Sequence, residues 1–268
     1  MKLEGLTVLD LSLFLPGPAA TQIMADHGAR IIKVENPRAP EPTRSADAFP
    51  WQQGDETVMF RNTQRGKESI ALDLKTDAGK HALLALAKTV DVVVEAFRPG
   101  VAERLGIDYA TLSQDNPGLV YCSISAFGQT GPWCNRPAHD TATVAAAGVL
   151  DVTRSPEGSS GPAIIGVPIA DMLPSNLALS GILMALLRRQ TTGQGDFVDI
   201  SMFESVLAAS PNIMGPVFGG DQAPERLKER THGGNAMLNV YETADAQYLA
   251  LGGGEHKFVT ALFEGLDR

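Results

Sequence analysis

Two apolar segments enclose a proline-rich loop and a helix-like stretch in Leu6-Thr-Val-Leu-Asp-Leu-Ser-Leu-Phe-Leu-Pro-Gly-Pro-Ala-Ala-Thr-Gln-Ile-Met-Ala-Asp-His-Gly-Ala-Arg-Ile-Ile-Lys-Val-Glu35. Residues 6–11 and 30–35 are short and mostly aliphatic, a pattern typical of buried strands. The prolines and the glycine at 16–18 predict a loop, and a helix is expected over residues 19–27, ended by Gly28. A strand, a helix and a second strand in this order predict a parallel βαβ unit with a right-handed crossover.

The same alternation of strand and helix continues along the chain, after a loop expected at residues 36–56. It predicts an α/β fold with a doubly wound, mostly parallel, Rossmann-like sheet. The predicted strands cover residues 69–74, 91–95, 118–125 and 197–202, and the predicted helices are 77–88 with Thr76 as its cap, a short helix from Pro99 and a long one after Asp171.

The domain organisation follows from a change in composition near residue 210. Residues 1–210 are predicted to form the large domain, and residues 211–225, rich in Gly and Pro without a clear period, the linker. Residues 226–268 are predicted to begin a small α+β domain. A hairpin is expected there, formed by residues 237–242 and 247–251, followed by a helix from Glu255.

Charge and composition exclude several classes of function. The chain has 268 residues and a net charge of −9, from 31 acidic and 22 basic side chains, which argues against a general nucleic-acid binder. Two cysteines are too few for a disulfide scaffold and indicate a reduced, cytoplasmic setting. Residues 1–30 lack a signal-peptide pattern, and polar or proline residues at 174–176 interrupt the strongest apolar stretch, so we expect a soluble protein without a membrane partner.

Several common site motifs are missing. A dinucleotide site needs G-x-G-x-x-G in the first βα turn, whereas this turn has only Gly17. Pro18 also lacks the N–H that a phosphate would need. Glu35 stands where a ribose-binding acid would be, but without the glycines it is weak evidence for a dinucleotide site. No nicotinamide cofactor is therefore expected. There is no G-x-S-x-G elbow and no P-loop lysine motif. The histidines are scattered without metal-ligand spacing, which predicts no metal site; they are His27, His81, His139, His232 and His256.

Asp171 is the only acid between Glu157 and Asp196, and it opens an almost wholly apolar helix. A carboxylate in this position can be an N-cap, or it can be a nucleophile or base in a place where water is scarce. The pair His139-Asp140 has a similar ambiguity, because such a pair at a helix start can serve as a cap or supply an acid and base.

Arginines and an aromatic ring gather where a predicted strand ends. Phe97 and Arg98 follow the strand at 91–95, and Arg104 lies in the short helix behind them. Arginines at the carboxyl edge of an α/β sheet could bind phosphates, with Phe97 stacked on an adenine and Lys75 adding charge. The alternative is an arginine-rich surface cap. Glycines at 233–234 and 252–254 indicate turns, or a flexible lid near a substrate.

Taken in order, several stretches resemble the class III CoA-transferase family, which includes the α-methylacyl-CoA racemases. The resemblance extends over nearly the whole chain. The matching stretches are Leu-Glu-Gly-Leu-Thr-Val-Leu-Asp-Leu at 3–11, Pro-Gly-Pro-Ala-Ala at 16–20, Gly-Ala-Arg-Ile-Ile-Lys-Val-Glu at 28–35, Leu-Asp-Leu-Lys at 72–75, Glu-Ala-Phe-Arg-Pro-Gly at 95–100, Phe-Gly-Gln-Thr-Gly-Pro at 127–132 and Gly-Ile-Leu-Met-Ala-Leu-Leu-Arg-Arg-Gln-Thr-Thr-Gly-Gln-Gly at 181–195.

This resemblance implies a transfer of coenzyme A between an acyl-CoA and a small carboxylic acid. It makes Asp171 the nucleophile, which forms an aspartyl anhydride and then aspartyl-CoA. Gly233 and Gly234 match a glycine loop that shields these intermediates. The positions matching those that bind coenzyme A are Leu72, Lys75, Phe97, Arg98 and Arg104.

The racemases of this family imply an alternative in which His139 and Asp171 exchange a proton at the α-carbon, with Asp140 and Glu255 as nearby acids. Racemases have a glycine-rich run directly after the aspartate, whereas this chain has Met-Leu-Pro-Ser-Asn at 172–176, which favours the transferase. A non-catalytic acyl-CoA-binding relative is the third possibility. Family members form interlocked homodimers and have longer chains, so we expect a homodimer and a form truncated at residue 268.

Overall fold

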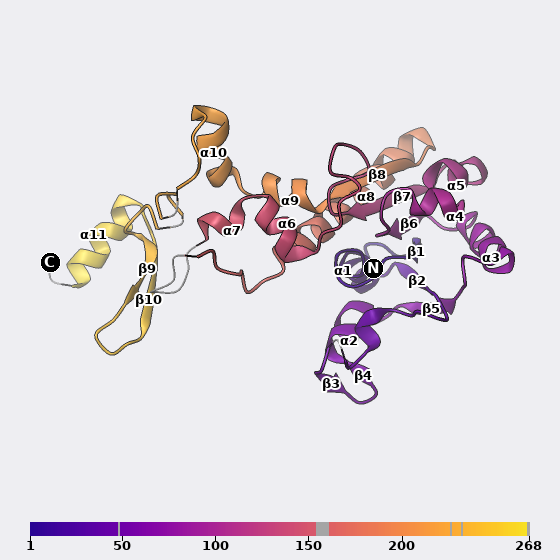
Figure 1. Cartoon of the computed structure of the whole chain (residues 1–268), viewed down its shortest axis with the longest axis horizontal. Coiled ribbons are helices and arrows are strands. Elements are labelled where there is room, and N and C mark those ends of the chain that lie inside the picture. The colour runs from indigo at the N-terminus through magenta and orange to yellow at the C-terminus, as the bar shows by residue number, and fades with distance from the viewer. Residues whose placement is uncertain (48, 154–160, 226, 232, 267–268) are drawn as a thin grey trace. The chain divides into compact units, whose positions relative to one another are not determined.

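The βαβ pattern of the sequence is present in the computed structural model of the chain (Figure 1). The structure describes residues 1–47, 49–153, 161–225, 227–231 and 233–266. Residue 226, where the small domain was predicted to begin, and His232 lie outside the described residues, as do residues 267–268 at the expected truncation. The chain divides into unit 1, Met1–Asp140 with Ile169–Ser205, and unit 2, Thr141–Pro168 with Val206–Arg268.

A six-stranded parallel sheet forms the centre of unit 1 and confirms the predicted α/β class. The strand order is β5-β2-β1-β6-β7-β8, so the direction of winding reverses between β1 and β6. In doubly wound sheets this switch point, at the carboxyl ends of the strands, is where ligands bind. The strands are β1 (Thr7–Asp10), β2 (Arg30–Glu35), β5 (Glu68–Ala71), β6 (Val92–Glu95), β7 (Val120–Ser125) and β8 (Asp196–Ser201).

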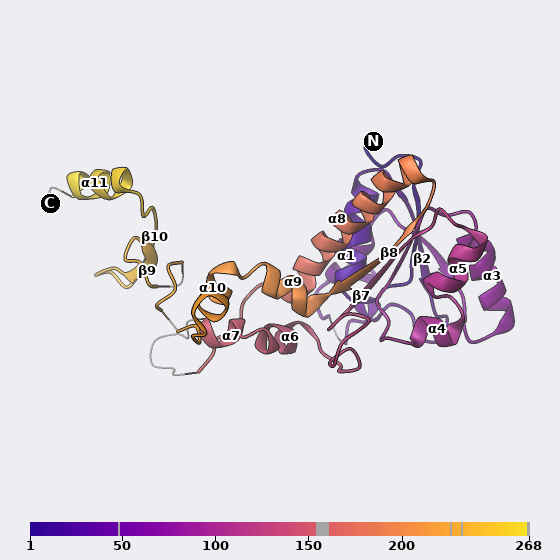
Figure 2. The same ribbon diagram turned by 90° about the horizontal axis from the view of Figure 1, so that it is seen from above.

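Helices cover both faces of this sheet (Figure 2). The first helix, α1 (Pro16–Asp26), packs beside α8 (Ile169–Thr192) on one face, and α8 also contacts β7 and β8. On the other face lie α3 (Asp77–Ala87), α4 (Val101–Leu105) and α5 (Tyr109–Asp115). Thr76 caps α3 as predicted, because its hydroxyl accepts the N–H of Gly79 at 3.1 Å.

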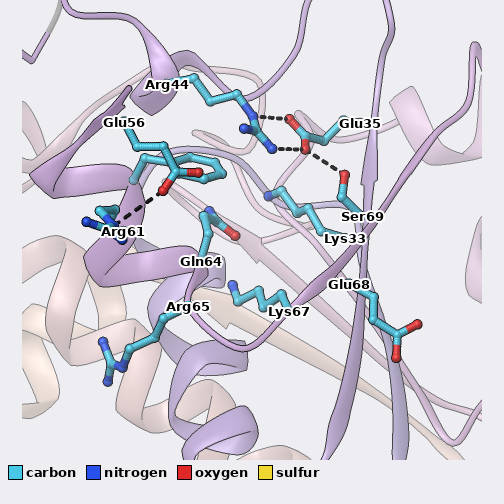
Figure 3. Close-up of a pocket in the computed structure, with 11 residues that line it drawn as sticks. Lys33, Glu35, Arg44, Glu56, Arg61, Gln64, Arg65, Lys67, Glu68 and Ser69 are labelled. Atoms are coloured by element: carbon cyan, nitrogen blue, oxygen red, sulfur yellow. Dashed lines mark hydrogen bonds and ion pairs between the residues drawn. The ribbon is translucent and has the colours of Figure 1, made fainter. Parts of the chain in front are cut away.

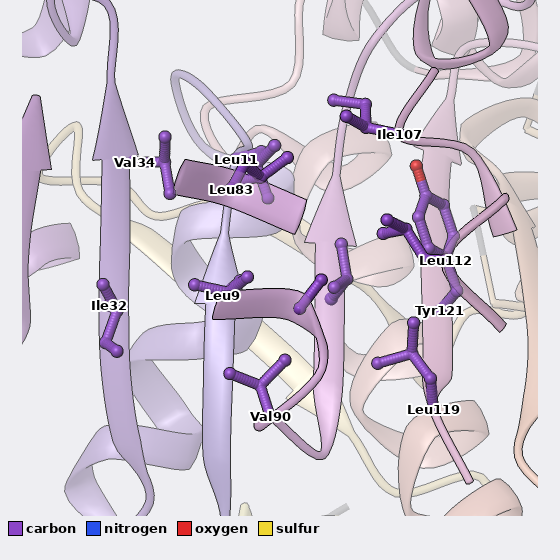
Figure 4. Close-up of a cluster of buried hydrophobic side chains, with 12 residues drawn as sticks. Leu9, Leu11, Ile32, Val34, Leu83, Val90, Ile107, Leu112, Leu119 and Tyr121 are labelled. Carbon is purple, nitrogen blue, oxygen red and sulfur yellow. The ribbon is translucent and has the colours of Figure 1, made fainter. Parts of the chain in front are cut away.

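The core under α3 and α5 is made of mostly aliphatic side chains from the sheet and from the helices on this face (Figure 4). Leu9 and Ile32 of the strands lie beneath Leu83 of α3, and Leu112 of α5 lies beside Tyr121 of β7. Leu9 is fully buried, and Leu83 and Tyr121 are nearly so. Removal of this apolar surface from water is the main force that holds the two layers together.

The first helix begins earlier than the sequence indicated. The first turn of α1 is formed by Pro16, Gly17 and Pro18, which were predicted as a loop. N–H groups in the first turn of a helix have no acceptor within the helix, so the prolines there cost no hydrogen bond. Gly17 is required for close approach, since a Cβ there would lie 2.2 Å from the Cβ of Ser12. The loop expected at 36–56 also contains regular structure, namely the 3-10 helix η1 (Pro42–Arg44) and the two-residue strands β3 (Gln52–Gln53) and β4 (Glu56–Thr57), and α2 (Val58–Gln64) follows it.

Helix α8 corrects one expectation about apolar segments. At 24 residues, with a mean hydropathy of 1.5 in its most apolar window, it is long and apolar enough to cross a membrane. Pro174 lies inside it without ending it. Its packing against α1, β7 and β8 is the packing of a core helix on a sheet, and a core helix has the same length and composition.

Unit 2 contains the predicted hairpin, formed by the antiparallel strands β9 (Leu238–Glu242) and β10 (Tyr248–Gly252). The predicted helix after Glu255 is also present as α11 (His256–Gly265). The segment 211–225 is not a plain linker, because α10 occupies Pro211–Gly220, with Pro211 in its first turn. Residues Thr141–Pro168 group with unit 2 rather than with the large domain predicted over 1–210. The remaining helices are α6 (Asp140–Ala146), α7 (Val149–Val152) and α9 (Met202–Ala208).

Candidate active site

The switch point of the sheet is flanked by the loops that follow β1 and β6. The N–H of Leu11 donates to the carbonyl of Val94 at 2.8 Å, so the two strands stay paired up to these loops. Because α8 precedes the parallel strand β8, its N-terminus lies at the same edge of the sheet. This edge therefore holds the segment 12–15, the segment 96–98 and Asp171 together in unit 1.

Asp140, and not Asp171, provides the side-chain cap of α8. One oxygen of the Asp140 carboxylate accepts the N–H of Ala170 at 2.7 Å and that of Asp171 at 3.3 Å. Asp171 is the third residue of the helix, so we correct the expectation that the helix amides hold its carboxylate. Capping and chemistry are divided between two carboxylates that are far apart in sequence.

The electrostatic surroundings of Asp171 make its carboxylate more basic than usual. Burial raises its pKa and so does the negative charge of Asp140, while His139 lowers it, with a result of about 6. The carboxylate is therefore mostly ionised at neutral pH and still a better base and nucleophile than an exposed aspartate. The structure thus brings together His139, Asp140 and Asp171, all predicted as site residues.

We expect Asp140→Asn to lower the pKa of Asp171 below about 6, because the variant removes the nearby negative charge. The amide oxygen of asparagine still accepts the two N–H bonds of α8, so the helix start is preserved. A carboxyl-carbon NMR titration of Asp171 measures the shift. Asp140→Ala is the control for the cap itself, with an expected loss of about 1 kcal/mol of stability. An unchanged Asp171 titration in Asp140→Asn would show that Asp140 acts only as a cap.

The loop after β1 and the start of α1 contact both helix α8 and the ring of His139. The hydroxyl of Ser175 donates to the carbonyl of Pro16 at 2.8 Å and to that of Asp171 at 2.7 Å, which fixes the start of α1 against α8. Phe14 has a φ of 63°, a left-handed conformation that is uncommon for an aromatic residue. Its ring meets the ring of His139 edge-on, with the centroids 6.1 Å apart. Such backbone strain is often found beside functional groups.

A buried cluster of charged side chains is hydrogen-bonded to the loop after β1. Lys33 pairs with Glu41 at 3.1 Å and with Asp10 at 3.8 Å, and Lys67 pairs with Asp10 at 3.0 Å. Glu41 in turn accepts the N–H of Phe14 at 3.0 Å. Burial opposes ionisation of Asp10, yet the two lysines hold its pKa well below the usual range. No sequence pattern predicted this cluster, although Asp10 and Lys33, charged residues inside otherwise apolar strands, were its signal.

A cavity of about 320 Å³ opens on the other side of the cluster (Figure 3). Its cations are already paired with carboxylates, as in Arg44 with Glu35 at 2.7 Å and Arg61 with Glu56 at 3.3 Å. Burial raises the pKa of Glu35, but hydrogen bonds from Arg44 and other donors outweigh this and bring it to about 2. Glu35, the position of a ribose-binding acid in dinucleotide folds, is thus used in an ion pair.

Among the described residues, no cluster of three or more His, Cys, Asp or Glu side chains could hold a metal.

The five positions matched to coenzyme A binding lie at the ends of β5 and β6 and on α4. Leu72 and Phe97 are half-buried and pack against the core cluster shown in Figure 4. Lys75, Arg98 and Arg104 are exposed, so their charges are available to an anionic ligand. Their role in binding remains a prediction.

The other predicted site residues belong to unit 2. Gly233 has a φ of 90°, and a Cβ on Gly234 would lie 2.2 Å from the carbonyl oxygen of Lys228, so both positions need glycine. Glu255 directly precedes α11. Their roles also remain predictions.

The model of CoA-transferase family III matches residues 3–268 of the chain. An acetyl-CoA:oxalate CoA-transferase from Acetobacter aceti is 37% identical over 255 residues, which are 95% of this chain and 64% of that protein. The human α-methylacyl-CoA racemase is 34% identical over 268 residues, 99% of this chain and 65% of the racemase. The crystal structure of a CaiB/BaiF family protein from Brucella suis has a TM-score of 0.85 at 31% identity, and covers 99% of this chain and 69% of its own. The chain thus spans less than two thirds of the length of these two curated relatives.

Proposed function

Since the chain belongs to the class III CoA-transferase family, we propose that it moves coenzyme A between an acyl-CoA thioester and a small carboxylic acid, with Asp171 as the nucleophile. The observation that carries this proposal is the state of Asp171. Its carboxylate lies at the carboxyl edge of the sheet, where ligands of doubly wound sheets bind, and burial is the main cause that raises its pKa to about 6. Asp140, and not Asp171, caps the helix. A relative that is 37% identical is a CoA-transferase acting on oxalate, which is such an acid.

In the proposed reaction a carboxylate oxygen of Asp171 attacks the thioester carbonyl carbon and expels the CoA thiolate, which leaves a mixed anhydride. The thiolate then attacks the aspartyl carbonyl, which forms aspartyl-CoA and releases the donor acid as a carboxylate. The acceptor carboxylate attacks aspartyl-CoA to give a second anhydride, and the thiolate takes over the acceptor acyl group and frees Asp171. Every step exchanges one acyl bond for another, so no oxidant or net proton is required.

The exposed cations that follow β5 and β6 suit the phosphates of coenzyme A. Arg98 and Arg104 present guanidinium groups that can bind phosphate oxygens in pairs, and Lys75 adds a further positive charge. Phe97 offers an aromatic face for the adenine. These contacts fix the cofactor end of the substrate, so that the thioester end can reach Asp171.

A second candidate is α-methylacyl-CoA racemisation. The observation in its favour is that His139 lies close enough to Asp171 to lower its pKa. A base and an acid beside one α-carbon are the groups that proton removal and return require. A relative with this activity also supports the alternative, since the human racemase is 34% identical to this chain.

Two measurements separate these reactions. With an acyl-CoA alone, hydroxylamine is expected to trap the acyl group released from the Asp171 anhydride, and Asp171→Asn is expected to abolish this trapping. In D₂O without an acceptor acid, a 2-methylacyl-CoA is expected to gain no deuterium at the α-carbon. Rapid deuteration that requires both His139 and Asp171 would instead establish the racemase. If neither reaction occurs while CoA binds, the protein is a non-catalytic relative.

A further inference from the structure

Glu95, the last residue of β6, is a buried carboxylate to which the proposed mechanism gives no role. Its side chain is 3% exposed. The strand register places it beside Ser123 of β7, which in turn lies beside Asp199 of β8. The three residues form a polar row across neighbouring strands, on the sheet face that carries α3, α4 and α5. Glu95 and Ser123 are buried, whereas Asp199 is exposed. Polar groups are buried only when hydrogen bonds replace their water.

Hydrogen bonds connect this row to both loops at the edge of the sheet. The N–H of Phe97 donates to Glu95 at 2.6 Å, so the carboxylate holds the turn that carries Phe97 and Arg98. The hydroxyl of Ser123 donates to Glu95 and accepts the side-chain amide of Gln129 at 2.8 Å. The N–H of Gln129 donates to Asp199 at 3.0 Å. Gln129 belongs to the loop after β7, which continues toward His139.

We propose that Glu95 is a positioning residue for coenzyme A. Through Ser123 and Gln129, Glu95 links the turn at 96–98 to the loop at 127–132. This inference rests on the proposed function, in which the turn holds CoA and the loop leads to the reacting groups. A CoA molecule that orders the turn then also orders the loop at 127–132, because the two loops share one hydrogen-bonded chain.

The charge of Glu95 has a separate, electrostatic effect on CoA binding. Burial raises the pKa of Glu95 and the negative charge of Asp199 adds to this, while the hydrogen bonds from Ser123 and Phe97 lower it, with a result of about 7. Two further titratable groups of β7 interact with its charge, the Tyr121 hydroxyl and the Cys122 thiol. Burial raises the pKa of each, and Glu95 adds to the increase. Protonated Glu95 therefore stabilises the fold fully below pH 4.5, and this contribution is lost as the pH rises through about 7. The ionised form places a buried negative charge beneath the site for an anionic ligand, in addition to the exposed charge of Asp199.

The test compares CoA binding by the full chain and by Glu95→Gln, which keeps an acceptor for Phe97 and mimics the protonated form. At pH 6 the two dissociation constants for CoA are expected to agree. At pH 8 the wild type is expected to bind CoA about fivefold more weakly than the variant. Glu95→Ala removes the acceptor, and it is expected to weaken CoA binding about tenfold at both pH values. A pH dependence in Glu95→Gln equal to that of the wild type would overturn the role of Glu95.

Amide hydrogen exchange tests the link between the loops without any ligand. Glu95→Ala and Ser123→Ala are each expected to speed exchange at both Phe97 and Gln129. Tyr121→Phe is the matched control, since it removes a buried hydroxyl on the same strand and face that has no hydrogen-bond partner among the described residues. Faster exchange at Phe97 alone would overturn the coupling. A wild-type protein that binds no CoA would refute the proposed function, and the exchange rates would still decide whether the loops are linked.

Discussion

Asp171→Asn is expected to lower the rate constant of CoA transfer by about 10³-fold or more, the largest effect of any single substitution in this chain. Asparagine has the shape of aspartate, and in this helix Asp140 supplies the cap, so the start of α8 is expected to remain intact. What the variant loses is an ionised oxygen that can attack the thioester. Steady-state kinetics should therefore show a loss in kcat, with CoA affinity close to that of the wild type.

The pH profile gives an independent check on the same carboxylate. Because Asp171 acts in its ionised form, the rate is expected to rise with pH through about 6 and then to level off. Ser180→Ala is a matched control, since Ser180 is exposed on the same helix and its hydroxyl donates only to the carbonyl of Asn176 among its described contacts. Full activity in Asp171→Asn would rule out Asp171 as the nucleophile.

The second large effect concerns stability. Lys33→Met is expected to lower the free energy of unfolding by about 3–5 kcal/mol, because it leaves the fully buried Asp10 and Glu41 without their shared cation. Lys67 still pairs with Asp10, so the loss is concentrated at Glu41 and at the loop it holds. Urea denaturation at neutral pH measures the change. The NMR signals of Phe14 and His139 should shift as well, since Glu41 accepts the N–H of Phe14.

Two further variants show whether the effect comes from buried charge. Arg30→Met removes a cation from the same strand, but its partner Glu68 is exposed, so little stability should be lost. The double variant Lys33→Met with Glu41→Gln removes the unpaired charge and is expected to recover part of the loss. Equal losses from Arg30→Met and Lys33→Met would contradict the argument from burial.

Local patterns in the sequence were sufficient for most of unit 1. The aliphatic run at residues 30–35 is β2 without a change of boundary, and Thr76 caps α3 as its position before a helical pattern predicts. Prolines caused the main errors of element assignment. Pro16 and Pro211 each begin a helix, where we expected a loop and a linker. A proline in the first turn loses no hydrogen bond, so it is compatible with both structures.

The candidate site also combines features that the sequence predicted with contacts that only the structure shows. Asp171 stood out because it is alone among apolar residues, and the resemblance to the family brought His139 and Asp140 beside it. The capping of α8 by Asp140 spans 30 residues, and the contact of Glu41 with Phe14 spans 27. Neither contact leaves a periodic signal, because no spacing rule connects a side chain to a backbone N–H in another element.

The sequence by itself determined the α/β class and the position of most strands, and it singled out Asp171 as a candidate site residue, since each depends on residues that are neighbours along the chain. Only the tertiary structure decided which acid caps α8, how Asp171 acquires a pKa of about 6, and how Glu95 joins two loops. These properties arise from burial and from charges that approach through the folding of the sheet. Distance in space, which sequence spacing does not encode, sets their magnitude.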